Sequence, residues 1–233
     1  MKKIVLFLVA IVVTMAINAQ SLEEIVKKFT EANKYDKVAS ISTIKITAKM
    51  SMMGMDVPMQ LLMKNPNKIK TTTNISGQEI IAVFDGVKGY SINPMSGSSA
   101  PVEMTADQIK NTQNSNLFQN PLATYFKAGK LTLLGEEKVN DKSAFKIKAD
   151  LDGGNSTSMF IDKATYYLIK NTSTVNAGGQ TMTVDSYPSD YKDINGLIVP
   201  MKTTSSAQGM EFTLVFDKVE VNVPIDDSVF QVK

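Results

Sequence analysis

Apolar and polar residues alternate with a period of two along most of the chain. The alternation begins at about residue 44, where every second position is apolar: Ile44, Ile46, Ala48, Met50 and Met52. It stops at Gly54 and Asp56 and resumes over residues 57–63. Such alternation is typical of strands with one buried face, and a short interruption containing glycine is typical of a hairpin. We therefore predict two paired strands whose apolar sides face the same way.

Similar segments follow, separated by residues that favour turns. Asn65-Pro66-Asn67 ends the first hairpin, and strands are predicted next over residues 69–75, 80–84 and 89–92. In the second half of the chain, strands are predicted over residues 131–134, 144–151, 158–162, 167–175, 182–191, 197–205 and 211–221. Turn residues such as Gly178-Gly179 and Asn195-Gly196 separate them. Tight turns between successive strands favour antiparallel pairing in chain order.

Two other segments have helical spacing. Ser21 and Glu24 form a capping box, and the apolar residues that follow recur every three or four positions: Leu22, Ile25, Val26, Phe29 and Ala32. Thr105 and Gln108 form a second possible capping box, and residues 117–127 gather apolar side chains around Pro121. These patterns predict an amphipathic helix at the start of the mature chain and short helices in its middle.

Together the elements predict a mainly β fold of the α+β type. We expect a half-open, strongly curved antiparallel barrel of about 11–12 strands, with the N-terminal helix and the central helical insert acting as a lid. Each strand contributes one apolar face to a shared interior. Periodicity does not decide whether side chains fill that interior or leave room for a ligand, so both alternatives stay open.

The first residues have the pattern of a secretory signal peptide. Lys2 and Lys3 precede an apolar run over residues 4–13, and Ala19 offers a small residue for cleavage. Cleavage there would release residues 20–233, which we expect to form one soluble domain in the periplasm. A lipoprotein would need a cysteine at the cleavage site, and the chain has none. No later segment approaches the roughly 18 apolar residues of a membrane-spanning helix, so we expect no permanent membrane anchor.

Composition narrows the chemistry. The chain contains no Cys, His, Trp or Arg, which removes most metal ligands and the usual bases of neutral-pH catalysis. Ser96-Gly97-Ser98-Ser99 lacks the glycine-flanked nucleophile of an esterase, and the acidic residues near Gly153 suit a hairpin turn better than a calcium loop. With 25 basic and 23 acidic residues, the chain has no charge excess suited to nucleic acid. We expect no enzyme activity, no cofactor, no metal and no nucleic-acid partner.

Methionine is concentrated in one place. Residues 50–63 hold six of the fourteen methionines, and methionine side chains adapt to partners of varying shape. They could line a pocket for a flexible apolar ligand or could fill the core. On the first alternative we predict an apolar cavity lined by Ile46, Met50, Met52, Met59, Leu61, Met63, Phe84, Tyr90 and Ile92. We predict that the lid contributes Leu22, Ile25, Phe29, Phe118, Leu122 and Phe126.

The order of these segments resembles the LolA/LolB-like superfamily of periplasmic lipoprotein-sorting proteins. The segments that carry the resemblance are residues 54–73 (GMDVPMQLLMKNPNKIKTTT), 84–97 (FDGVKGYSINPMSG), 133–151 (LLGEEKVNDKSAFKIKADL), 159–170 (MFIDKATYYLIK), 191–202 (YKDINGLIVPMK) and 221–230 (VNVPIDDSVF). The resemblance implies an unclosed barrel whose helical lid covers a cavity for acyl chains. The lipoprotein carrier of that family holds its lid with an arginine of the first strands, and this chain has Lys45 and Lys49 in that region.

The function expected on this basis is that of a carrier. It would bind acyl chains of lipoproteins or lipids, taking them from an inner-membrane donor protein and passing them to an outer-membrane acceptor protein. The alternative is a non-catalytic sensor or protein-interaction domain with a packed barrel interior. An empty apolar cavity inside the barrel would favour the carrier, and a closely packed interior would favour the interaction domain.

Overall fold

A computed structural model describes residues 20–114, 116–177 and 180–231. The expected signal peptide and the turn expected at Gly178-Gly179 lie outside these residues. Within them, no helix is both long enough and apolar enough to cross a membrane.

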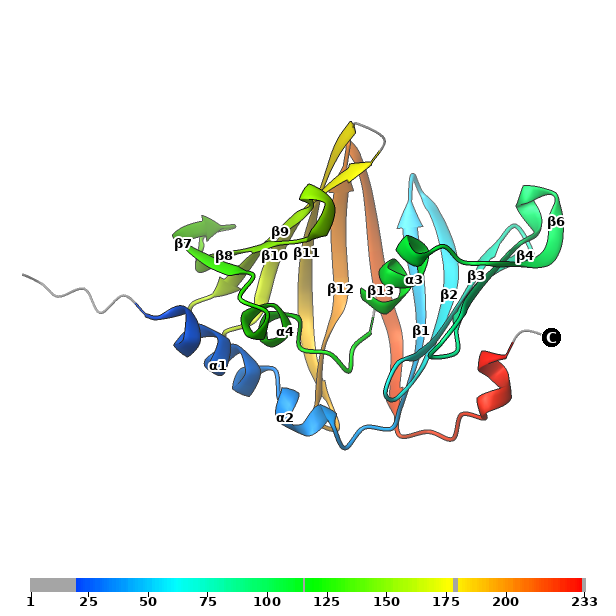
Figure 1. Ribbon diagram of the computed structural model, residues 1–233, viewed down its shortest axis with the longest axis horizontal. Coiled ribbons are helices and arrows are strands. Elements are labelled where there is room, and N and C mark those ends of the chain that lie inside the picture. The colour runs from blue at the N-terminus through cyan, green and yellow to red at the C-terminus, as the bar shows by residue number, and fades with distance from the viewer. Residues whose placement is uncertain (1–19, 115, 178–179, 232–233) are drawn as a thin grey trace, which may run out of the picture.

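A single antiparallel sheet of 13 strands forms the body of the molecule (Figure 1). Its spatial order is β6-β5-β4-β3-β2-β1-β13-β12-β11-β10-β9-β8-β7, so β1 and β13 join the two halves of the chain. The strands are β1 Thr43–Met52, β2 Met55–Lys64, β3 Lys68–Ile75, β4 Gln78–Phe84, β5 Gly89–Asn93, β6 Ser98–Glu103, β7 Leu131–Val139, β8 Lys142–Asp150, β9 Ser156–Asp162, β10 Leu168–Ala177, β11 Gln180–Ile194, β12 Leu197–Ala207 and β13 Met210–Val221. Because β6 and β7 end the order without pairing to each other, the sheet stays open, as predicted.

The first hairpin has both apolar faces on one side, as predicted. Met50 pairs with Val57, Ala48 with Met59 and Ile46 with Leu61, which places the apolar residues of both strands on one side. Met53 and Gly54 make the turn with φ of 51° and 79°. Positive φ at both central residues is the two-residue turn that matches the twist of paired strands.

The helices are short, and side chains cap several of them. They are α1 Leu22–Ala32, α2 Tyr35–Val38, α3 Ala106–Asn114 and α4 Pro121–Lys127, with 3-10 turns η1 Pro94–Ser96, η2 Asp152–Gly154 and η3 Asp227–Phe230. The Ser21 hydroxyl accepts a hydrogen bond from the Glu24 amide at 3.1 Å and begins α1. Thr105 and Gln108 exchange both bonds of a capping box before α3, at 2.8 and 3.3 Å. Both predicted helix starts are confirmed.

Three elements differ from the prediction. Strand β6 and helix α2 were not expected, and β7 runs to Val139 rather than ending at residue 134. The β6 sequence SSAPVE is mostly small and contains Pro101, which a strand tolerates at a sheet edge, where its missing N–H leaves no partner unpaired. Helix α2 has four residues, too few to establish a period.

The two faces of the sheet have different coverings. We call the inner face the one that carries Ile44, Ile46 and Ile147, because helical residues pack against these side chains. Figure 1 shows the helices within the curve of the sheet and η3 beyond β3. In η3, Phe230 is 1% exposed. Asp227 forms ion pairs with Lys64 at 2.9 Å and with Lys68 at 3.1 Å. These contacts hold η3 on the outer face of the sheet.

Candidate binding site on the inner face of the sheet

Helices α1 and α4 are packed firmly onto the second half of the sheet. Their side chains Ile25, Phe29 and Leu122 are at most 4% exposed. They form one buried cluster, the α1/α4 cluster, with strand residues Phe145, Ile147, Ala149, Met159 and Ile161. Full burial of each large side chain contributes about 1.5–3 kcal/mol to stability. This part of the lid is therefore held closed by its own apolar contacts.

Hydrogen bonds made by side chains add to that closure. The Asn120 amide donates to the Thr30 hydroxyl at 2.8 Å and links α4 to α1. Asn33, at the end of α1, donates to the carbonyl oxygen of Tyr166 at 3.1 Å, and the Tyr166 hydroxyl donates to Gln20 at 3.0 Å. Together these bonds tie both ends of α1 to the sheet side of the molecule.

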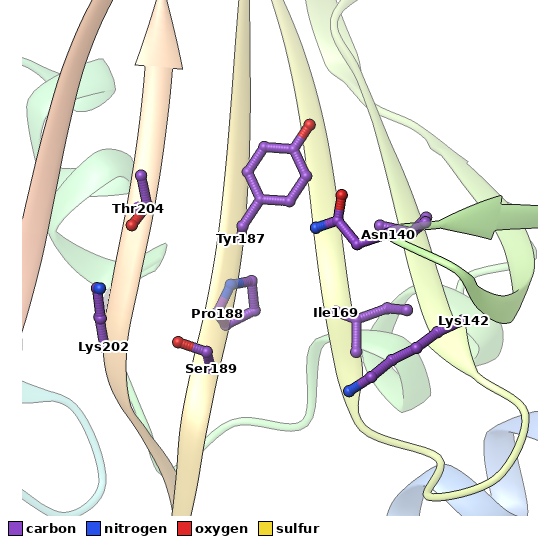
Figure 2. Close-up of a pocket in the computed structure, with 9 residues that line it drawn as sticks. Asn140, Lys142, Ile169, Tyr187, Pro188, Ser189, Lys202 and Thr204 are labelled. Atoms are coloured by element: carbon purple, nitrogen blue, oxygen red, sulfur yellow. The ribbon is translucent and has the colours of Figure 1, made fainter.

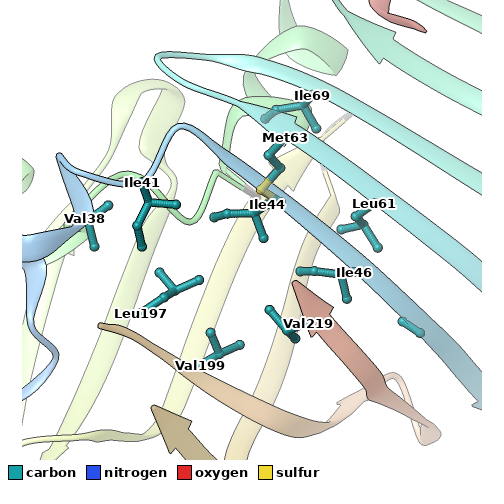
Figure 3. Packing of buried hydrophobic residues seen from close by; sticks show 11 residues of the cluster. Val38, Ile41, Ile44, Ile46, Leu61, Met63, Ile69, Leu197, Val199 and Val219 are labelled. Atoms are coloured by element: carbon teal, nitrogen blue, oxygen red, sulfur yellow. The ribbon is translucent and has the colours of Figure 1, made fainter. Parts of the chain in front are cut away.

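A second buried cluster lies where β1, β2 and β12 meet α2 (Figure 3). Three residues of the predicted cavity, Ile46, Leu61 and Met63, belong to it and are at most 8% exposed. We call it the α2 cluster, and its other buried members are Val38, Ile41, Ile44, Ala48, Ile69, Leu197, Val199 and Val219. These side chains contact each other, so this end of the inner face is packed.

The packing loosens along the same strands toward the β1–β2 turn. Met50, Met52 and Met59 are half-buried, and the turn residue Met53 is 80% exposed. On the neighbouring strand, Leu214 lies opposite Met50 and Phe212 opposite Met52. We call these five half-buried residues, Met50, Met52, Met59, Phe212 and Leu214, the methionine track. It is a continuous apolar strip that runs from the packed α2 cluster to solvent.

A row of polar side chains continues from the track across the inner face. Phe212 pairs with Ser205, Ser205 with Ser186, and Ser186 with Asn171. The Ser186 and Ser205 hydroxyls lie 2.9 Å apart, and Thr157 donates to the Asn171 side-chain oxygen at 2.6 Å. Ser205 and Thr157 are buried. This polar row lies between the strand residues of the two clusters and offers hydrogen-bonding groups inside an otherwise apolar surface.

The polar row was not among the residues predicted from the sequence. Its members come from four strands, β9 to β12, and only the register between strands brings them together. The sequence does contain a sign of this row. Ser, Thr and Asn occupy alternate positions of these strands, where a strand with one buried face usually has apolar residues.

The predicted cavity residues do not all share one face. Phe84 pairs with Gly89 and lies on the inner face with its other partner, Ile69. Tyr90 pairs with Val83 and Ile92 with Ile81, so both side chains project from the opposite face. Placing Tyr90 and Ile92 in the same cavity as Phe84 was therefore wrong. Successive residues of a strand alternate between the two faces of the sheet. The four-residue turn between β4 and β5 fixes which residues of β5 share a face with Phe84.

The remaining lid residues vary in how they pack. Leu22 packs beside the α1/α4 cluster and Phe118 beside the α2 cluster, both partly buried. Phe126 is 36% exposed. Lys45 and Lys49 alternate with the inner-face residues of β1 and so point outward, and Lys49 lies 3.8 Å from Asp56. Neither lysine reaches the helices to act as a latch.

Burial also raises the pKa of two tyrosines, Tyr35 and Tyr191. Tyr35 packs against both clusters, and burial raises its pKa to about 12. Burial likewise raises the pKa of Tyr191, whose hydroxyl donates to the Leu168 carbonyl at 2.7 Å. These phenols stay neutral at physiological pH and act as packing groups. Among the described residues, no three Asp or Glu side chains gather as metal ligands.

Two surface pockets are lined by other residues. One, of about 500 Å³, lies between β11, β12 and the β7–β8 turn, and the other, of about 570 Å³, lies beside Lys64 and Asn222–Asp226. None of the predicted cavity residues lines either pocket. The inner face offers apolar contact and hydrogen bonds, arranged around a closed lid.

Comparison with known proteins identifies the fold. No family model matches the sequence, and no curated protein is similar to it in sequence. Several solved structures align over most of the chain, and three of them have TM-scores of 0.60 or 0.61. A DUF1329 family protein from Desulfovibrio piger has a TM-score of 0.61 and 12% identity, covering 89% of this chain and 97% of its own.

The second is described as an outer membrane lipoprotein-sorting protein domain from Vibrio parahaemolyticus, with TM-score 0.61, 12% identity and coverage of 90% and 97%. The third is a LolA superfamily protein from Nitrosomonas europaea, with TM-score 0.60, 13% identity and coverage of 92% and 99%. The open 13-stranded sheet with helices on its inner face is thus the LolA-like fold found in lipoprotein-sorting proteins.

Proposed function

We propose that this protein is a periplasmic carrier that shelters acyl chains of lipoproteins or lipids during transfer toward the outer membrane, without covalent chemistry. The observation that carries the proposal is the methionine track. It joins solvent at the β1–β2 turn to the apolar interior beneath the helices. An acyl chain could enter along it without crossing a polar barrier. The shared fold with a lipoprotein-sorting domain supports the same function.

Loading requires the lid to move, because both clusters are packed in this structure. Exposing a side chain such as Phe29 or Leu122 costs about 1.5–3 kcal/mol, and each sheltered methylene of a ligand contributes about 0.8 kcal/mol. Two to four methylenes thus offset one displaced side chain. Each additional methylene of the acyl chain therefore favours opening of the lid.

A binding experiment tests the proposal. We expect the purified mature chain to take up a fluorescent long-chain fatty acid, and native mass spectrometry to find lipid on material isolated from the periplasm. Met50→Gln together with Met59→Gln should weaken uptake about tenfold, because polar amides replace apolar contacts along the track. Met95→Gln is the control, since Met95 is 58% exposed outside the track. Absence of both lipid and uptake would count against a carrier.

The second candidate is a sensor or protein-interaction domain with a packed interior. The low exposure of Ile46, Leu61 and Met63 favours it, because these side chains fill part of the space that a ligand would need. The two candidates differ in chain-length dependence. A carrier binds longer fatty acids more tightly, whereas a packed domain binds none and keeps its unfolding temperature unchanged in their presence.

A further inference from the structure

The outer face carries a groove that has no part in the proposed carrier function. It has a volume of about 500 Å³ and is lined by Val139, Asn140, Lys142, Ile169, Tyr187, Pro188, Ser189, Lys202 and Thr204 (Figure 2). Strands β11 and β12 supply one wall, and the β7–β8 turn with Ile169 supplies the other. The volume lies within the range of about 300–1,000 Å³ that is typical of small-molecule sites.

Strand register separates this groove from the inner face. Tyr187 pairs with Thr204, and Ser189 pairs with Lys202. Both pairs alternate with Ser186 and Ser205, which belong to the polar row of the inner face. A molecule in the groove therefore does not touch the methionine track, and the sheet lies between the two sites.

Two lysine side chains give the groove positive charge. Figure 2 places Lys142 and Lys202 on opposite sides of it, and neither forms an ion pair with a carboxylate of residues 20–114, 116–177 or 180–231. No acidic residue is among the nine that line it. Asp185, on the same face as Tyr187, is paired with Lys170 at 3.1 Å. The two ammonium groups are thus left to interact with an anion from outside.

The floor between the lysines is built of apolar side chains, and the Lys170 ammonium lies 5.3 Å from the Phe160 ring centroid and 5.4 Å from that of Tyr187. Val139, Ile169 and Tyr187 pack with Ala144 and Phe160 in a small cluster of the outer face, and Val139 is 7% exposed. The hydroxyls of Ser189 and Thr204 and the side-chain amide of Asn140 stand at the edges. An apolar surface flanked by two cations and a few neutral polar groups has the composition of a site for a small amphipathic anion.

We propose that this groove binds a small amphiphile with a phosphate monoester or carboxylate head group and a short apolar body. The head group lies in the positive potential of Lys142, on β8, and Lys202, on β12. The apolar body lies on Ile169 and the Tyr187 ring. Lysine ammonium groups bind a phosphate as point charges, so no arginine is needed.

Methyl NMR distinguishes this site from the inner face. With the methyl groups of Ile and Met labelled, octyl phosphate should shift the Ile169 signal in a saturable manner. Inorganic phosphate should give a much weaker effect, because it lacks the apolar body, and neutral octyl glucoside should leave Ile169 unchanged. If octyl phosphate moves only Met50 and Met59, the ligand enters the inner face and the proposal is wrong. Equal binding of inorganic phosphate would refute the role of the apolar floor.

Charge-removing variants test the two lysines. Lys142→Met with Lys202→Met keeps apolar stems of similar length and should weaken octyl phosphate binding about tenfold, as expected for two partly exposed ion pairs. The control is Lys138→Met, which removes an exposed charge from the same hairpin outside the groove. A similar loss in the control, or no loss in the double variant, would overturn the assignment. Unchanged Ile169 signals in the ligand-free variants show that the fold is intact.

Discussion

The side-chain amide of Asn120 donates a hydrogen bond to the Thr30 hydroxyl at 2.8 Å, so that α4 is tied directly to α1. The same Asn120 side chain accepts from the Ala123 amide at 3.0 Å and caps α4. One residue therefore both begins a lid helix and fastens it to its neighbour.

Breaking this tie should loosen the lid. Thr30→Val removes the hydroxyl and keeps the side-chain shape, leaving the cap of α4 intact. We expect the free energy of unfolding to fall by about 1 kcal/mol and the uptake of a fluorescent fatty acid to become faster. Stopped-flow fluorescence measures the rate. Thr124→Val is the control, because its exposed hydroxyl bonds only within α4, to the Asn120 carbonyl oxygen. Equal acceleration in both variants would argue against a tie.

The polar row should contribute to stability. Thr157→Val is close to isosteric and leaves the Asn171 side-chain oxygen without its 2.6 Å donor. Because Thr157 is buried, we expect a loss of about 1–2 kcal/mol in urea unfolding. A change below the error of the measurement would mean that water replaces the lost donor.

Alkaline pH should weaken the contact between the two clusters. Burial raises the pKa of Tyr35 to about 12, above the value of about 10 for an unfolded tyrosine. The stabilisation that the buried, neutral Tyr35 phenol gives the folded protein is therefore fully present below pH 10 and is lost as the pH rises from 10 toward 12. We expect Tyr35→Phe to lose less stability than the wild type between pH 9 and pH 11, measured by thermal unfolding. Identical losses would show that Tyr35 ionises freely in the folded protein.

Acid should release the C-terminal turn. The hydrogen-bonded Lys64 ammonium, followed by that of Lys68, lowers the pKa of Asp227 below its usual range. The ion pairs of Asp227 stabilise the fold fully above the pKa that this carboxyl has in the unfolded chain. Their stabilisation is lost as the pH falls through the lower pKa of Asp227 in the folded protein. Asp227→Asn should therefore be less stable than the wild type at pH 7 and equal to it near pH 2. Glu79→Gln, an exposed change with no ion pair among the described residues, should show no such convergence.

Much of the fold could be predicted because alternation within a strand is local. The pattern from Ile44 to Met63 specified a hairpin with a common apolar side, and the capping boxes at Ser21 and Thr105 marked helix starts. The strand β6 could not be predicted, since its six residues carry no alternation.

The site was harder to predict because it depends on register between strands. Tyr90 and Ile92 are apolar and lie close to Phe84 in sequence, yet the pairing of Phe84 with Gly89 sends them to the other face. The polar row from Thr157 to Ser205 needs four strands in register. Which residues are packed and which are half-buried, as for Met63 and Met59, depends on where the helices settle.

Paramagnetic broadening of methyl signals by 5-doxyl stearic acid tests the central claim most directly. If an acyl chain occupies the inner face, the methionine methyl signals of Met50, Met52 and Met59 broaden strongly at one equivalent of ligand, and that of Met95 stays sharp. Uniform broadening of all four, or none at any, would contradict a carrier that binds its cargo along the methionine track.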